Sequence, residues 1–196
     1  MNHDYSALTE VNLKGAAVYA QAPSKDHGQV TLASAATDVM TDFHHTPAIT
    51  ISGDAIIDDA NTKMISFGIR SLLVVDAAQK IIGIVTATDI LGEKPMKHLQ
   101  KRGGRYQDIT VSDIMTASSR LLFVHYSDLT KAKVGHVLKT LKQSGRQHTL
   151  ILEENEDGLE IVRGIISAAQ IARQLGIAVS TGDIAHTFVE IEKILA

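Results

Sequence analysis

The sequence contains no cysteine and no tryptophan, and aromatic residues make up only 4% of its 196 residues. Without cysteine there can be no disulfide, thiol nucleophile or thiolate metal ligand, and nothing indicates an oxidising compartment. No apolar run approaches the ~20 residues that a membrane helix needs, and the first residues lack the apolar stretch of a signal peptide. We therefore expect a cytoplasmic protein without a membrane partner.

The chain also has no large excess of charge of either sign, since its formal net charge is −3. A strongly basic balance, which would indicate a nucleic-acid partner, is missing. The length and a hydrophobic fraction of 44% suit one compact domain or two small ones. Because aromatic residues are scarce, the core has to be built from Ile, Leu, Val, Ala and Met, which favours an α/β fold.

The sequence contains an internal repeat. The segment SDIMT at 112–116 echoes TDVMT at 37–41, and GIISAAQIA from Gly164 echoes GIVTATDIL from Gly83. These matches divide the chain into five parts: an N-terminal extension (1–36), a first repeat (37–92), a basic connector (93–111), a second repeat (112–176) and a C-terminal helix (177–196) with one apolar face.

Hydrophobic periodicity predicts the same elements in both repeats. For the first we expect a strand at 48–52, a helix that ends at Gly68, strands at 72–75 and 81–85, and a short helix that closes near Gly92. The second has a strand at 122–125, a helix that ends at Gly145, strands at 149–152 and 161–166, and a helix at 168–175. The predicted fold is α/β, with two βαββα units related by an approximate twofold axis, each with a small mixed sheet. Because one unit alone buries little surface, the two should pack together.

These repeats resemble the CBS domain, named after cystathionine β-synthase, and residues 37–176 resemble a tandem CBS pair. The resemblance is carried by the motifs DVMT and DIMT, the strand GIRSLLVVD, and the segment GIVTATDIL. It implies a regulatory module rather than an enzyme. The ligand would be an adenosine compound, such as AMP, ADP, ATP or S-adenosylmethionine, held in a cleft between the repeats. It also implies a homodimer that signals to an effector protein.

The resemblance implies a binding site around the motif G-x-x-T-x-x-D, whose Thr and Asp contact the ribose and phosphate in the family. In this sequence they are Thr86 and Asp89. The side facing the base maps to Thr46, Pro47, Ala48, Ile69, Arg70 and Ser71. The residue types fit, since a carboxylate at a helix start can accept hydrogen bonds from both ribose hydroxyls. Free N–H groups near Ala87 and Thr88 would suit a phosphate.

The second repeat departs from this motif, with Ser167 in place of Thr86 and Gln170 in place of Asp89. A neutral amide forms weaker hydrogen bonds than a carboxylate, so we expect binding there to be weaker by roughly tenfold. Arg146, Gln147 and His148 lie at the matching strand entrance and could reach a phosphate or a base edge. The hypothesis is one competent site per chain, built around Asp89.

Other interpretations remain open from the sequence alone. Asp89 could simply cap its helix, and the pair could be a ligand-free scaffold for dimerisation. The basic connector (Lys94 to Arg105) is typical of a flexible, solvated linker, with a polyphosphate or nucleic-acid patch as the alternative. His44 and His45 are expected to be ordinary loop residues rather than metal ligands, and the acidic run 153–160 an exposed turn. No phosphate-loop, dinucleotide or nucleophile-elbow motif indicates catalysis.

Overall fold

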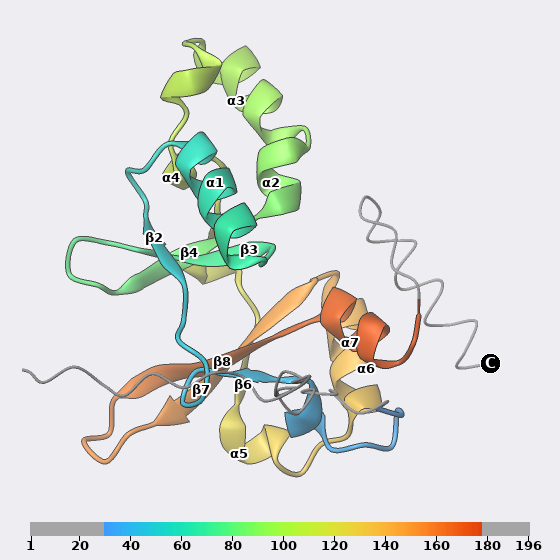
Figure 1. Ribbon diagram of the computed structural model, residues 1–196. Coiled ribbons are helices and arrows are strands. Elements are labelled where there is room, and N and C mark those ends of the chain that lie inside the picture. The colour runs from blue at the N-terminus through green and yellow to red at the C-terminus, as the bar shows by residue number, and fades with distance from the viewer. Residues whose placement is uncertain (1–29, 178–196) are drawn as a thin grey trace, which may run out of the picture.

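The computed structural model describes residues 30–177, and the predicted C-terminal helix and most of the N-terminal extension lie outside them. Both repeats have the predicted order of elements (Figure 1). The first contains β2 (Thr50–Ser52), α1 (Ile57–Phe67), β3 (Ser71–Val75), β4 (Ile81–Thr86) and α2 (Ala87–Leu91). The second contains β6 (Phe123–His125), α6 (Val134–Ser144), β7 (His148–Glu154), β8 (Glu160–Ser167) and α7 (Ala168–Gln174).

The first helix of each repeat ends at a glycine in the left-handed region. Gly68 after α1 and Gly145 after α6 both have φ of 62°. Glycine pays no Cβ penalty there, and its N–H satisfies carbonyl groups of the last turn. The two predicted helix ends are confirmed.

The sheets are shared between the repeats, which the sequence did not predict. One sheet has the order β2-β3-β4-β5, where β5 (Thr116–Ala117) comes from the start of the second repeat. The other has the order β1-β8-β7-β6, where β1 (Thr41–Asp42) comes from the start of the first. Each repeat therefore lends its opening motif to its neighbour's sheet as an antiparallel edge strand.

Two glycines make this exchange possible. A Cβ on Gly83 of β4 would lie 2.6 Å from the Thr116 carbonyl oxygen, and a Cβ on Gly164 of β8 would lie 2.6 Å from that of Thr41. Real Cβ atoms do not approach backbone atoms this closely, so the two strands would have to move apart to make room for a side chain. The repeated glycine is therefore the residue type that lets the neighbour's edge strand approach.

The hydrophobic cores follow the same exchange. Ala36 and Val39, on the short 3-10 helix η1 (Ala36–Val39), pack in the core of the second repeat. Val111 and Ile114, on α4 (Val111–Ile114), pack with Ile109 in the core of the first. The repeats thus fold as one interlocked unit.

The basic connector is partly helical rather than the flexible linker that its composition suggested. It forms α3 (Lys94–Arg102), with Pro95 in the first turn, where a missing N–H costs nothing. A 3-10 turn, η2 (Tyr106–Asp108), follows, and η3 (Ser118–Arg120) and α5 (Tyr126–Leu129) complete the described elements. Among residues 30–177, no helix has the length and apolar character needed to cross a membrane.

Candidate functional site

Asp89 belongs to a capping box at the start of α2. Thr86 is the N-cap, and its hydroxyl accepts a hydrogen bond from the Asp89 N–H at 3.1 Å. In return, Asp89 Oδ2 accepts from the Thr86 N–H and hydroxyl, both at 2.8 Å. The pair satisfies N–H groups that a helix start leaves unpaired, so the capping role considered for Asp89 is present, with Thr86 rather than Asp89 as the N-cap.

The other oxygen of Asp89 is held by Lys94. Lys94 Nζ lies 2.6 Å from Asp89 Oδ1 and also donates to the Ile114 carbonyl at 2.8 Å. A carboxylate offers about four acceptor positions. Three have partners in the described structure, so a ligand hydroxyl would use the remaining position or displace Lys94.

The residues expected around the base lie at one end of the first sheet, where β3 begins and β4 ends. Ser71, the first residue of β3, pairs with Thr86, the last of β4. Because β2 runs parallel to β3, the segment before β2, which contains Thr46, Pro47 and Ala48, reaches the same end of the sheet. Ile69 and Arg70 directly precede β3. The fold therefore brings the residues expected around the base to the same end of the first sheet as Thr86.

The expectation of free amides for a phosphate is wrong at Ala87. Its N–H donates to the Arg70 carbonyl at 2.9 Å, because α2 begins directly at the strand pair. The Asp89 N–H is taken by Thr86. With only five residues, α2 also has little dipole to offer. The expectation for the Thr88 N–H stays a prediction, and side chains would have to supply the other contacts to a phosphate.

His148, the first residue of β7 in the second repeat, interacts electrostatically with Asp89 at this end of the first sheet. Desolvation lowers the pKa of this partly buried side chain to about 4, and the negative charge of Asp89 offsets part of the effect. His148 is therefore neutral at pH 7. Its interaction with Asp89 places the start of β7 near the carboxylate of the first repeat.

The equivalent position in the second repeat has the same backbone and a different charge. The Ala168 N–H donates to the Gln147 carbonyl at 2.9 Å, and the Gln170 N–H to Ser167 Oγ at 3.1 Å, as in the first repeat. Here Gln170 Oε1 accepts from the Thr41 hydroxyl at 3.2 Å. Gln170 therefore joins the edge strand β1 to α7, and this position lacks a carboxylate.

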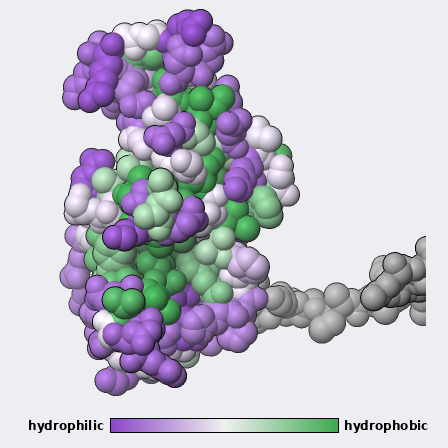
Figure 2. Space-filling model, turned by 90° about the vertical axis from the view of Figure 1, so that its left-hand side faces the viewer, coloured by the Kyte–Doolittle hydropathy of each residue, from purple (hydrophilic) through white to green (hydrophobic). Residues whose placement is uncertain are grey.

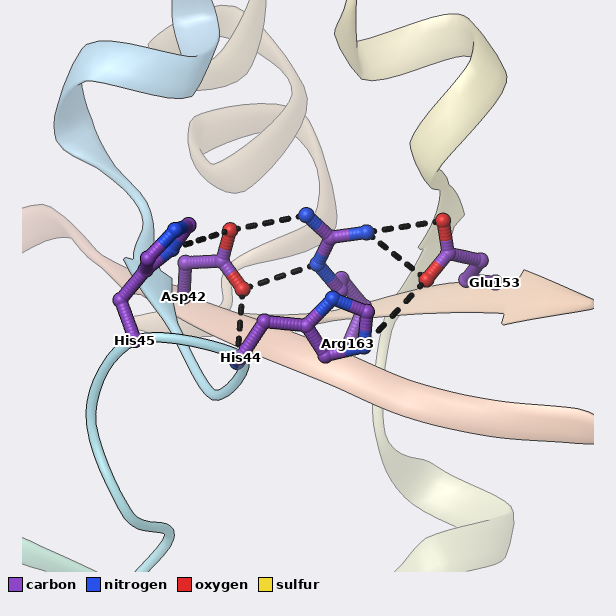
Figure 3. Close-up of polar contacts among 5 residues, drawn as sticks. All are labelled: Asp42, His44, His45, Glu153 and Arg163. Atoms are coloured by element: carbon purple, nitrogen blue, oxygen red, sulfur yellow. Dashed lines mark hydrogen bonds and ion pairs between the residues drawn. The ribbon is translucent and has the colours of Figure 1, made fainter. Parts of the chain in front are cut away.

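A second polar cluster was missed by the sequence analysis (Figure 3). Arg163 on β8 lies between Asp42 on β1 and Glu153 on β7, and donates to each carboxylate at 2.8–2.9 Å. These bonds hold the pKa of Asp42 well below its usual range and raise that of Arg163. The guanidinium also stacks on the Tyr126 ring, 4.4 Å from its centroid. Glu153 was expected in an exposed acidic turn, but its position on a strand beside Arg163 gives it a structural partner.

His44 and His45 border this cluster. His45 Nδ1 lies 3.2 Å from Asp42 Oδ2, and His44 Nε2 lies 3.8 Å from Glu153 Oε2. Within residues 30–177, no group of three or more His, Asp or Glu side chains is arranged to hold a metal ion. No spacing in the sequence pointed to the cluster: Glu153 and Arg163 meet on the paired strands β7 and β8, and Asp42 joins them only through the exchanged strand β1.

Comparisons with known proteins identify the fold. The family model of the CBS domain matches residues 36–95, and no curated protein matches the sequence. A solved protein from Pyrococcus horikoshii is 20% identical, with a TM-score of 0.52; the match covers 78% of this chain and 99% of that one. A CBS-domain-containing protein from Agrobacterium tumefaciens is 19% identical (TM-score 0.52, covering 73% and 94%). CBSX2, solved in complex with AMP, is 21% identical (TM-score 0.50, covering 71% and 94%).

The matched segment spans the first repeat from η1 to the start of α3, and the second repeat has the same order of strands and main helices, with η3 and α5 in addition. The described chain has two small four-stranded sheets with helices, as the resemblance implied. Residues 36–95 therefore match the CBS domain model, and the described chain has the fold of a tandem CBS-domain protein.

Proposed function

We propose that this protein is a regulatory module that binds an adenine nucleotide or a related adenosyl compound beside Asp89, where the two repeats meet. The proposal rests on the grouping of Thr86, Asp89 and Ser71 at one end of the first sheet. His148 from the other repeat interacts electrostatically with Asp89 of this group. A ligand at this position would touch both repeats. It could then shift their packing, provided that it binds one arrangement more tightly.

The type of ligand is supported by two considerations. CBSX2, which has the same fold, was crystallised with AMP. Asp89 also has an acceptor position left for a ribose hydroxyl, and hydrogen bonds to a charged acceptor are stronger than those to neutral groups. AMP, ADP, ATP and S-adenosylmethionine are the compounds to test.

The experiment is titration calorimetry of the full chain with each of these four compounds, followed by the same titration of Asp89→Asn. We expect one strong site per chain, and a loss of about tenfold in affinity in the variant, because a neutral amide replaces the charged acceptor. A thermal-shift panel gives a second readout, since ligand at 100 times its Kd stabilises the fold by about 2.7 kcal/mol.

Asp113→Asn is a matched control. Asp113 forms the same capping box with Thr110, accepting from its N–H at 2.9 Å and from its hydroxyl at 2.8 Å. The control therefore loses an equivalent cap but keeps the Asp89 carboxylate with its partners Thr86 and Lys94. Equal loss of binding in both variants would assign the effect to helix capping, and no binding by the natural chain would favour the ligand-free scaffold.

We further infer that two copies associate through the helices of the first repeat. Ile65 and Phe67 on α1 and Leu91 on α2 are 72%, 55% and 70% exposed. The two helices are neighbours on the side of the first sheet that faces away from the second repeat (Figure 1). Large apolar side chains exposed on neighbouring helices indicate an interaction surface, and a second copy of the chain would bury them. An effector protein would then recognise the altered dimer.

A further inference from the structure

The helix that replaces the expected flexible linker forms one wall of a cavity. This cavity, here called the α3 pocket, lies between α3 and α4 and has a volume of about 510 Å³. It is lined by Lys94, Lys97, His98, Lys101, Arg102, Ser112, Asp113, Ile114, Met115 and Arg120. Five of these ten residues are lysine or arginine and one is acidic, so the pocket has a large excess of positive charge.

Part of this charge is already neutralised. Lys94 pairs with Asp89, Lys97 pairs with Glu93 at the rim, and His98 Nδ1 lies 3.8 Å from Asp113 Oδ1. Asp113 is itself occupied by its capping box with Thr110. Burial opposes ionisation of Asp113, but these hydrogen bonds and the charges of His98 and Arg102 lower its pKa. The carboxylate is therefore ionised and cannot neutralise the whole pocket.

Three cations have no ion-pair partner, and the one carboxylate of the pocket, Asp113, offsets only part of their charge. Among residues 30–177, no side-chain hydrogen bond or ion pair engages Lys101, Arg102 or Arg120. Lys101 and Arg102 come from the last turn of α3, and Arg120 from η3, so different elements bring their charges to one cavity. Like charges held together with too little counter-charge repel each other, and a multivalent anion would relieve this repulsion.

The form of the site favours a small polyanion over a nucleic acid. The chain as a whole has a net charge of −3, so the cations of the α3 pocket are a local cluster and not part of an overall basic protein. On the face drawn in Figure 2, the end that contains α3 is mainly hydrophilic, and hydrophobic residues gather lower down, over the second repeat. Single-stranded nucleic acids need a charged track with several aromatic platforms, whereas the connector sequence 93–111 contains one aromatic residue, Tyr106.

We propose that the α3 pocket binds a small ligand with several phosphate groups, such as inorganic polyphosphate or the polyphosphate part of a nucleotide. Arginine forks and lysine ammonium groups are the side chains that bind phosphate oxygens best. Lys94 links this pocket to the proposed nucleotide site, because its ammonium lines the pocket and also holds Asp89 Oδ1. An anion that draws Lys94 away would free Asp89 for a ribose.

The test is titration calorimetry with inorganic tripolyphosphate as the probe. It compares the natural chain with a triple variant, Lys101→Ser, Arg102→Ser and Arg120→Ser. The control, Lys80→Ser, Lys131→Ser and Lys139→Ser, removes three exposed lysines elsewhere on the surface. We expect the pocket variant to lose at least about tenfold in affinity and the control to stay within about twofold, because only the pocket cations contact the probe. Circular dichroism of each variant confirms that it is folded.

Three results would overturn the proposal: no binding of tripolyphosphate by the natural chain, equal binding by the pocket variant, or tighter binding of a single-stranded oligonucleotide that the same variant abolishes. AMP binding by the same proteins separates this proposal from the function proposed above. Asp89→Asn should weaken the binding of AMP and leave the binding of tripolyphosphate unchanged. Either proposal can therefore be disproved while the other stands.

Discussion

Arg163 and Asp42 lie 121 residues apart in the sequence, yet Arg163 donates to both Asp42 carboxylate oxygens, at 2.8 and 2.9 Å. The same guanidinium donates to Glu153, so one cation joins three strands that include the exchanged edge strand β1. The Arg163 side chain is only 12% exposed. The ion pair is therefore shielded from water and connects the opening of the first repeat to the sheet of the second.

Replacing Arg163 with Met should destabilise the fold strongly. The change leaves Asp42 and Glu153 as partly buried carboxylates without a counter-charge, and breaking a buried ion pair on one side costs about 3–5 kcal/mol. Because both acids keep some contact with water, we expect the lower part of this range. Urea unfolding followed by circular dichroism measures the difference.

Arg105→Ala is the control for this prediction. Arg105 forms a fork with Asp108 of similar geometry, at 2.8 and 3.1 Å, but the side chain is 72% exposed. Since exposed ion pairs add little to stability, this variant should unfold at nearly the same urea concentration as the natural chain. If the two arginine variants had equal effects, the shielding of the Arg163 cluster would be irrelevant to the fold.

Gly83→Ala and Gly164→Ala test the exchange of edge strands. The added methyl would lie 2.6 Å from a backbone oxygen of β5 or β1, so a strand has to move. Overpacking of this kind costs about 1–3 kcal/mol. We expect both variants to lower the free energy of unfolding and to increase amide hydrogen exchange in the edge strand concerned.

Gly135→Ala offers a comparison within the same chain. Gly135 lies in the first turn of α6, and the nearest atom to its added methyl is the Leu32 oxygen, at 3.4 Å. Alanine has the better helix propensity, by roughly 1 kcal/mol, so the substitution should be neutral or mildly stabilising. Destabilisation equal to that of Gly83→Ala would mean that glycine loss alone, and not the approach of the neighbouring strand, causes the effect.

The sequence predicted the local elements because their signals are local. Apolar periodicity marked α1 and α6, and Gly68 and Gly145 marked their ends. The family resemblance implied that Thr86, Ser71 and Ala48 share a site, and the strand order of the first repeat places these positions at one end of its sheet. The exchange of β1 and β5 left no periodic pattern, because each is only two residues long.

The charged partners could not be predicted for a similar reason. Asp42 and Arg163 meet only because β1 pairs with β8, and Lys94 reaches Asp89 only because the connector folds into α3. Composition alone favoured a flexible connector. The packing of Pro95, which is buried, and of Leu99 against the first core outweighs that preference.

Charged substitutions on α1 and α2 should separate the proposed dimer. Ile65→Glu combined with Leu91→Glu would place carboxylates in the interface and oppose its burial. We expect light scattering after size exclusion to show a dimer for the natural chain and a monomer for this variant. Leu159→Glu, which changes a side chain that is 63% exposed on the β7–β8 hairpin, should leave the dimer intact. A natural chain that stays monomeric at high concentration would disprove this assignment.

His148 should make the stability of the protein depend on pH between about 4 and 6.5. Its pKa is lowered from 6.5 to about 4 in the folded chain, because burial disfavours the charged form. The unfolded chain therefore takes up the proton first as the pH falls. The contribution of His148 is complete above pH 6.5 and is lost as the pH drops towards 4, by about 3 kcal/mol at most. Asp42 responds in a separate window, below its unperturbed pKa of 3.8, because Arg163 lowers its pKa.

Urea unfolding of the natural chain and of His148→Gln at pH 7.5, 6 and 5 isolates this contribution from that of the other histidines. Glutamine keeps a polar side chain of similar length but does not titrate. The natural chain should lose more stability than the variant between pH 7.5 and 5, and the larger part of this extra loss should fall between pH 6 and 5. Equal losses at every pH would show that His148 titrates normally and is not desolvated where the two repeats meet.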